Sequence, residues 1–245
     1  MTFLITALTL RELLGQRRIW ALLVLASVPV AVAVLFRLGD RQDVAVEFTE
    51  VALLAGIVTT GVLPVIAVVI ATSALGNEFE DMTALFLLAK PIARSEIVIG
   101  KWLAAAVVIV LLVVPASAGG AWLALGGGAA ADVIPGFTLA FVLAACAYSA
   151  VLLALSIITS RALVVGLVYA FLWEGAMTTL FKGARVLSIR QFTLGLADAW
   201  TPVPGSRFEA KLEGEVAFAG IITTIVLGLL VAAWRLSRWE AGESL

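Results

Sequence analysis

The sequence predicts an all-α, polytopic membrane protein that forms a single transmembrane domain over residues 1–245. Hydrophobic residues make up 62% of the 245 positions and charged residues only 13%, whereas soluble domains carry nearer a quarter. Six apolar runs come close to the ~20 residues that cross a bilayer core as a helix. Lipid offers no partner for backbone polar groups, so each run must be helical. The predicted spans are 19–36, 51–75, 101–125, 136–159, 162–181 and 215–236.

Residues 2–16 precede the first predicted span and place apolar side chains near helical spacing. We interpret this segment as an interfacial helix lying along the membrane surface. The alternative is that it extends the first span inward. The interfacial interpretation is favoured because the charged residues at its end would be costly in hydrocarbon; these are Arg11, Glu12, Arg17 and Arg18.

Composition excludes several functions. The net charge of −1 provides no basic field for nucleic acid. The chain has no histidine, which removes the commonest transition-metal ligand and the most accessible general base. Its acids are scattered rather than clustered at one depth, so an embedded enzyme is disfavoured. We therefore expect no cofactor, no metal and no catalytic residue.

The distribution of Lys and Arg orients the chain. With the N-terminus inside, nine of these residues fall on inner segments and seven on outer ones, and five of the seven lie in 182–214. Lys and Arg are enriched in cytoplasmic loops, and long loops count little in this positive-inside rule. We expect a multi-pass protein of the cell inner (plasma) membrane with both termini cytoplasmic.

Residues 76–101 form a polar stretch between two apolar runs, on the predicted cytoplasmic side. Asn77 followed by Glu80 predicts a helix N-cap, and acids in the first turn suit the helix dipole. Pro91 ends that helix, and Ser95 is expected to cap the next. An interfacial helix on anionic headgroups would explain the apolar face but not the acids. A groove on a protein partner explains both.

This stretch resembles the cytoplasmic loop of ABC-2 type transporter permeases. The residues that carry the resemblance are Glu-Phe-Glu-Asp at 78–81, then Leu-Leu-Ala-Lys-Pro-Ile-Ala-Arg at 87–94, and Gly100-Lys101 before the third span. The pattern is most similar to the branch that includes the permease of the nitrous-oxide-reductase maturation transporter. The order of an N-terminal helix, six spans and a long outer segment extends the resemblance along the chain.

The resemblance implies that residues 76–100 are a coupling segment seated on a separate ABC ATPase subunit. It also implies a second permease subunit, identical or paralogous. The implied function is a permease that switches access as the ATPase closes on ATP, and the resemblance favours export over import. The residues implied to contact the ATPase are Glu78, Phe79, Glu80, Asp81, Leu85, Phe86, Lys90, Pro91 and Arg94.

The chain lacks the motif that would let it bind ATP itself. A phosphate-binding loop needs a glycine, four residues, then Gly-Lys and a hydroxyl residue. At Gly100-Lys101 the first glycine is replaced by Ser95 and the hydroxyl residue by Trp102. The energy for transport must therefore come from a partner.

Glu174 is a carboxyl group well inside the fifth predicted span. It lies about 16 Å along a helix that starts near Leu163, where a charge is costly unless it faces protein or water. It either lines the translocation path or the dimer interface, or pairs with Lys182 or Arg185 near the outer surface. Gly175 beside it permits close helix approach.

Residues 182–214 form the predicted extracytoplasmic segment. The family resemblance suggests two short half-helices there, whereas 186–196 by itself fits neither a helical nor a strand period. The alternative function for the whole chain is an ion-coupled secondary carrier or channel, for which Glu174 is the main support.

Overall fold

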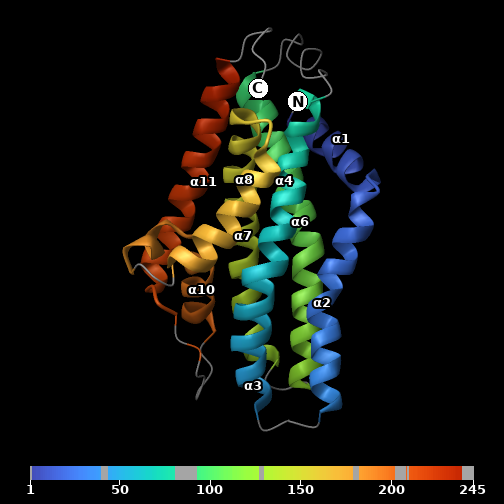
Figure 1. Cartoon of the computed structure of the whole chain (residues 1–245), viewed down its shortest axis with the longest axis vertical. Helices are drawn as coiled ribbons and strands as arrows, with labels where there is room; N and C mark the ends of the chain where they lie inside the picture. Colours follow the sequence, from blue (N-terminus) through green and yellow to red (C-terminus); the bar gives the residue numbers. More distant parts are fainter. Residues whose placement is uncertain are drawn as a thin grey trace.

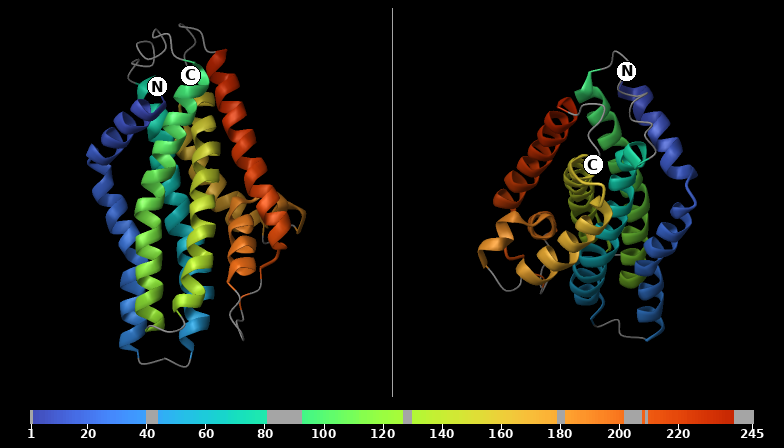
Figure 2. Two further views of the ribbon diagram at one scale, coloured as in Figure 1. Left: turned by 180° about the vertical axis from the view of Figure 1, so that it is seen from behind. Right: turned by 45° about the horizontal axis from the view of Figure 1, so that its top comes forward.

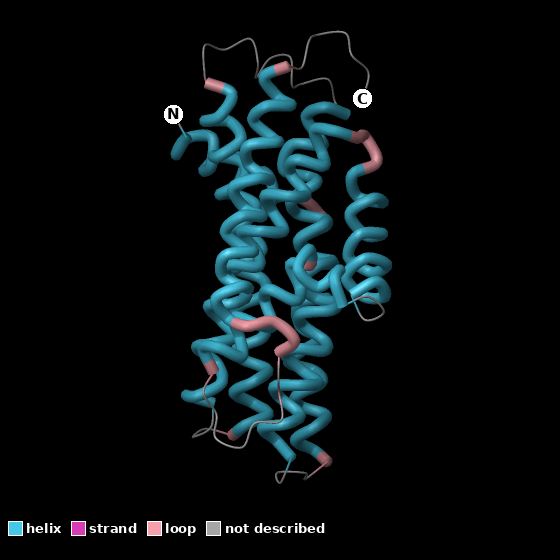
Figure 3. Tube along the Cα trace, turned by 90° about the vertical axis from the view of Figure 1, so that its left-hand side faces the viewer, coloured by secondary structure: helices cyan, strands magenta, loops and turns pink. Residues whose placement is uncertain are grey.

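The chain folds into a bundle of helices, described by a computed structural model for residues 2–39, 44–80, 93–126, 130–178, 182–201, 208 and 210–238. Within these ranges the regular structure is helical, and Figure 3 shows no strand. Five helical segments are long and apolar enough to cross a membrane: Arg18–Leu38, Ala45–Gly76, Arg94–Leu125, Ala131–Ile158 and Gly214–Ser237. They coincide with five of the six predicted spans.

The N-terminal segment forms its own helix, α1 (Thr2–Gly15), followed by α2 (Arg18–Leu38). The chain bends between them at residues 16 and 17, and Figure 1 shows α1 at an angle to α2. Residues Ile5, Thr6, Thr9 and Leu13 of α1 are buried, and α1 packs on the start of α6. The bend separates this helix from the first span, as the interfacial interpretation requires. Its depth relative to a bilayer stays a prediction.

The second span is one continuous helical rod made of α3 (Ala45–Glu47), η2 (Phe48–Val62) and α4 (Leu63–Glu80). η2 is a wide π-helix, and the Thr59 hydroxyl accordingly donates to the carbonyl of Leu54, five residues back, at 2.7 Å. The α-helix resumes at Leu63, next to Pro64. Proline lacks an N–H donor, so a change of helical pitch there loses little hydrogen bonding.

The two central helices are α6 (Arg94–Leu125) and α7 (Ala130–Ile158). At 32 residues, α6 extends about 48 Å and exceeds the membrane core at one end or both. α7 contacts α4, α6, α10 and α11. Its Tyr148, Phe137 and Phe141 are among the largest fully buried side chains. The hydrophobic core therefore lies around α7.

In the fifth predicted span, 162–181, the described helix is shorter than expected, and residues 179–181 lie outside the described part of the chain. α8 (Ala162–Val168) continues into the π-helix η3 (Tyr169–Met177), and the apolar helix covers only Ala162–Ala176. Such a helix reaches at most about 22 Å, less than a core about 30 Å thick. The chain then continues through a 3₁₀ turn, η4 (Lys182–Leu187). The count of six full spans is therefore not confirmed.

In its described residues, the predicted outer segment 182–214 contains one α-helix, α10 (Ile189–Trp200), before the last span, α11 (Gly214–Ser237). α10 packs against both α7 and α11, and Figures 1 and 2 show it beside them rather than beyond the end of the bundle. Its buried residues include Phe192, Leu196 and Ala197. This helix of the segment is therefore folded onto the bundle rather than exposed as a solvated loop.

The start of α1 and the end of α11 lie at the same end of the bundle, with the ends of α4 and α6 that flank residues 81–92 (Figure 1). α2 and α11 form opposite edges of the bundle (Figure 2). Only 28% of the apolar window of α2 and 22% of that of α11 are buried within the chain. These two helices present their apolar surface to lipid or to another subunit.

Candidate functional site

The predicted coupling residues fall at the junction between α4 and α6. Glu78, Phe79 and Glu80 belong to the last turn of α4, and Arg94 is the first residue of α6. The remaining predicted contacts, which are Asp81, Leu85, Phe86, Lys90 and Pro91, lie outside the described residues.

Two details of the predicted helix ends are wrong. Asn77 does not begin a new helix, because α4 continues through it to Glu80. An interior Gly76 weakens a helix by only about 1 kcal/mol, which the preserved backbone hydrogen bonds outweigh. Ser95 is not a cap either, since α6 begins at Arg94 after an extended Ala93 with no capping side chain. The start of α6 is held by a tertiary contact instead.

Arg94 and Lys101 join α6 to two other helices at this end of the bundle. The guanidinium of Arg94 donates to the carbonyl of Leu236 in the last turn of α11 at 3.1 Å. The amine of Lys101 donates to the carbonyl of Ala74 in α4 at 2.7 Å. Lys101 is 1% exposed, and Arg94 lies at the C-terminus of α11, where the helix dipole favours positive charge. We call this pair the inner-end clamps, after the cytoplasmic side that the sequence predicts for this end of the bundle.

Gly100 brings α1 against the same stretch of α6. The Thr6 hydroxyl donates to the carbonyl of Gly100 at 3.1 Å. A Cβ at Gly100 would lie 3.0 Å from the side chain of Ile5 and 3.2 Å from the carbonyl oxygen of Thr2. The Gly-Lys pair in the family-like motif therefore has two structural roles here, with the glycine admitting α1 and the lysine holding α4.

Replacing Gly100 by valine is expected to detach α1 from α6. The branched side chain exceeds the space left by Ile5, and overpacking of this kind costs about 1 to 3 kcal/mol. Cleavage of the purified chain within α1 by a protease should become faster. Gly15→Val is the matched control, because an added Cβ there meets no heavy atom within 4 Å. Equal protection of α1 in both variants would contradict the packing role of Gly100.

Glu174 lies in a different part of the molecule, where η3 meets α7 and α10. Its side chain is 1% exposed. The Tyr148 hydroxyl of α7 donates to carboxyl oxygen Oε2. Oxygen Oε1 accepts from three groups: the Tyr169 hydroxyl at 3.2 Å, the Ser188 hydroxyl at 3.3 Å and the backbone N–H of Arg190 at 3.1 Å. We call these five residues the Glu174 cluster.

The cluster fixes the start of α10 to the short η3 helix. Ser188 is the N-cap of α10, and its oxygen accepts from the backbone N–H of Gln191 at 3.3 Å. The Arg190 guanidinium donates to the backbone carbonyl of Glu174 at 3.3 Å. A buried carboxyl group is tolerated when its oxygens receive several hydrogen bonds. The arrangement accounts for the burial of this carboxyl group at the junction of η3 and α10.

The geometry places Glu174 inside the chain rather than on an open surface. The Arg185 side chain, one of its predicted partners, donates to the carbonyl of Thr178 at 3.4 Å. A Cβ at Gly175 would meet no heavy atom within 4 Å, so the close approach expected there is not made by the described helices. The roles of Glu174 and Gly175 in a translocation path or dimer interface stay predictions.

Sequence reasoning missed the partners of Glu174, although one signal for α10 was present. Ser188 followed three residues later by Gln191 is a capping-box pattern. Ile189, Phe192 and Leu196 then recur at helical spacing. Tyr148 and Tyr169 carried no comparable signal, because an isolated tyrosine in an apolar run fits any buried position.

Comparison with known proteins identifies the family of the chain. The comparison with curated proteins finds no match. A family model described as "ABC-2 family transporter protein" matches residues 5–193, from α1 into α10. The match covers most of the bundle, including the inner-end clamps and the Glu174 cluster. The chain belongs to the ABC-2 transporter membrane family.

Proposed function

We propose that this chain is the permease subunit of an ABC exporter whose ATP hydrolysis occurs in a separate subunit. Members of the matched family are membrane permeases and are generally non-catalytic transport subunits. In the proposed mechanism, ATP binding closes two ATPase subunits, and residues 76–100 move with them. The bundle then changes which side of the membrane it opens to. We also infer the nitrous-oxide-reductase branch, on the pattern of residues 78–101.

The observation that carries this proposal is the pair of inner-end clamps. Residues 81–92 connect α4 to α6 in sequence, and each flanking helix is tied to the bundle by a buried or half-buried cation. A displacement applied to that connection would therefore reach α4, α6 and α11 together. A loop that only joined two spans would not need its ends fixed to a third helix.

The helices that receive this motion are suited to transmit it. α6 is unbroken from Arg94 to Leu125, and Trp102 donates from its indole N–H to the carbonyl of Cys146 in α7 at 2.9 Å. Hydrogen-bonded helices in a packed core move as rigid elements rather than deforming continuously. A small shift at the start of α6 would thus be delivered to α7, which also packs against α4, α10 and α11.

We further propose that two permease subunits form the transporter. The support is the large apolar surface of α2 and α11, most of which is not buried within the chain. One of these surfaces would pack against the second subunit and the other would face lipid. Oligomer size in nanodiscs, together with cross-linking through cysteines introduced at exposed positions of α2 and α11, tests this arrangement.

Arg94→Ala should uncouple ATP hydrolysis from transport in the complex of this chain with its ATPase. Removing the guanidinium releases the start of α6 from the Leu236 carbonyl. Hydrolysis by the assembled complex should persist, while export into proteoliposomes falls at least about tenfold. A tenfold fall is expected because the coupling energy decreases by the contribution of one charge-assisted hydrogen bond. The measurement is both rates on the same preparation.

Arg238→Ala is the matched control for this experiment. Arg238 follows α11 at the same end and stacks on Trp234 at 4.4 Å from the ring centroid, so its loss removes an equal charge without releasing α6. Two results would overturn the proposal: failure of the chain to co-purify with any ATPase, or transport driven by an ion gradient without ATP.

A further inference from the structure

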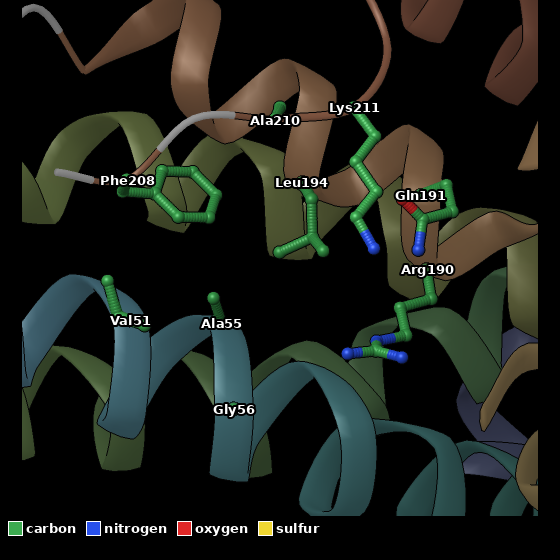
Figure 4. Close-up of a pocket in the computed structure, with 9 residues that line it drawn as sticks. All are labelled: Val51, Ala55, Gly56, Arg190, Gln191, Leu194, Phe208, Ala210 and Lys211. Carbon is green, nitrogen blue, oxygen red and sulfur yellow. The ribbon is translucent and has the colours of Figure 1, made fainter. Parts of the chain in front are cut away.

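A cavity of about 280 Å³ opens between η2, α10 and the chain that returns toward α11. Figure 4 shows its nine lining residues: Val51, Ala55, Gly56, Arg190, Gln191, Leu194, Phe208, Ala210 and Lys211. It lies beside the Glu174 cluster, since Arg190 belongs to both. Neither the resemblance nor the family match assigns anything to this cavity.

The walls of the cavity are held by contacts made elsewhere in the fold. The Asp198 carboxyl group accepts from the backbone N–H of Ala210 at 3.1 Å, which holds residues 210 and 211 against α10. The aromatic ring of Phe208 packs against that of Phe137 in α7, with ring centroids 5.7 Å apart. The Glu174 cluster fixes the opposite end of α10. The cavity is therefore preformed along α10.

One side of the cavity is polar and its hydrogen-bonding capacity is incompletely used. Gln191 is 2% exposed, and its side-chain oxygen has no hydrogen-bond partner among the described residues. Nε of Arg190 is likewise buried without a partner there. The Lys211 amine and the Arg190 guanidinium point toward the same part of the cavity (Figure 4). No acidic residue is among the nine that line it.

Buried polar groups of this kind are normally satisfied by a partner. Two cations favour an anionic oxygen, and Arg offers several donors in a fixed fork. An unpartnered amide oxygen favours a donor, such as a hydroxyl group, next to that anion. The opposite side is apolar, formed by Val51, Ala55, Leu194 and Phe208, and suits an alkyl or acyl portion of the same ligand.

We propose that this cavity binds an amphiphilic anion, namely a phosphate or carboxylate group that carries a hydroxyl and an apolar chain. Arg190 and Lys211 would hold the anionic oxygens, Gln191 would accept from the hydroxyl group, and the apolar wall would hold the chain. An anionic lipid with a hydroxylated headgroup has this chemistry. Binding at the cavity requires no ATP, so it can be measured whether or not the proposed transport function holds.

The test titrates short-chain lipids into the purified full-length chain in zwitterionic nanodiscs. Dihexanoyl phosphatidylglycerol should bind at least about tenfold more tightly than dihexanoyl phosphatidylcholine. The phosphate charge of phosphatidylglycerol is not neutralised within its headgroup, whereas the choline group of phosphatidylcholine neutralises it. Lys211→Gln should weaken phosphatidylglycerol binding about tenfold. Ala55→Leu, which narrows the apolar side without altering charge, should weaken it as well.

Arg11→Gln is the control for loss of one positive charge, since Arg11 is exposed on α1, away from the cavity. Equal binding of the two lipids, or unchanged binding in both cavity variants, would overturn the proposal. Inorganic phosphate provides the remaining arm. If phosphate displaces the lipid at comparable concentration, the site recognises a free anion and the amphiphile assignment is wrong. Retention of the lipid supports that assignment.

Discussion

Glu174→Ala should lower the stability of the chain strongly. Two tyrosine hydroxyls, one serine hydroxyl and one backbone N–H donate to the carboxyl group. An alanine leaves all four donors without that acceptor in a buried region. A buried donor without a partner costs about 1 to 3 kcal/mol. Some hydroxyls can rotate to other acceptors, so we expect the free energy of unfolding to fall by roughly 3 to 5 kcal/mol in total.

The loss should be localised at the junction of η3 and α10 before it becomes global. The backbone N–H of Arg190 cannot rotate away, so the first turn of α10 bears the strain. Hydrogen exchange at residues 188–192 should therefore rise in Glu174→Ala, and the midpoint of thermal unfolding in detergent should fall. Both measurements can be made on the isolated chain, independently of transport.

Glu174→Gln is the matched variant, because its amide oxygen can still accept from Arg190 and from one hydroxyl. We expect it to retain most of the stability lost in the alanine variant. If alanine and glutamine destabilise the chain equally, hydrogen bonding is not what holds this carboxyl group in place. A stable Glu174→Ala chain with impaired export would instead favour the predicted role in the translocation path.

Gly136→Ala is the second change with a large expected effect. Gly136 lies on α7 where the end of α10 crosses it, and a Cβ there would be 2.7 Å from the carbonyl oxygen of Trp200 and would also overlap the hydroxyl of Thr201. Backbone atoms cannot move aside as a flexible side chain can. The free energy of unfolding should fall by about 1 to 3 kcal/mol in net, despite the roughly 1 kcal/mol gained by replacing a helical glycine with alanine.

The control for this substitution is Gly119→Ala in α6. An added Cβ at Gly119 would have a methyl group of Val30, at 4.0 Å, as its nearest neighbour outside its own helix backbone. The substitution should be neutral or slightly stabilising, since alanine is the better helix former. The measurement is the thermal midpoint together with the rate of proteolysis between α10 and α11. Similar midpoints for the two variants would show that α10 does not depend on contact with Gly136.

The five long spans were predictable because lipid leaves an apolar run of that length no alternative to a helix. The described extent of the fifth predicted span, 162–181, was not predictable, because its composition to residue 181 resembles that of the others. Glu174 in that run belongs to a cluster whose donors come from α7, η3 and the start of α10, up to 26 residues away in sequence. A single carboxyl group in an apolar run does not indicate whether it faces lipid, a pore or a cage of hydroxyls.

The candidate site divides in the same way. The Gly100-Lys101 motif lies near the start of α6, where the contacts of the candidate site are found. The resemblance indicated the family that the match to residues 5–193 then confirmed. The hydrogen-bond acceptors of Arg94 and Lys101 could not be predicted. Leu236, for example, lies 142 positions from Arg94 and offers only a backbone carbonyl. Backbone acceptors occur at every residue, so sequence does not mark which one a buried cation will find.

By itself, the sequence determined that this chain is a helical membrane protein, where its long helices run and which polar stretch joins two of them. Those properties follow from the one-dimensional pattern of apolar and charged residues, since the bilayer acts on each segment separately. Only the tertiary structure decided that α10 folds onto α7 and that a half-polar cavity opens beside it. These features depend on the close approach of glycines, hydroxyl groups and carbonyls from distant segments, and their free energies arise only once the helices are packed.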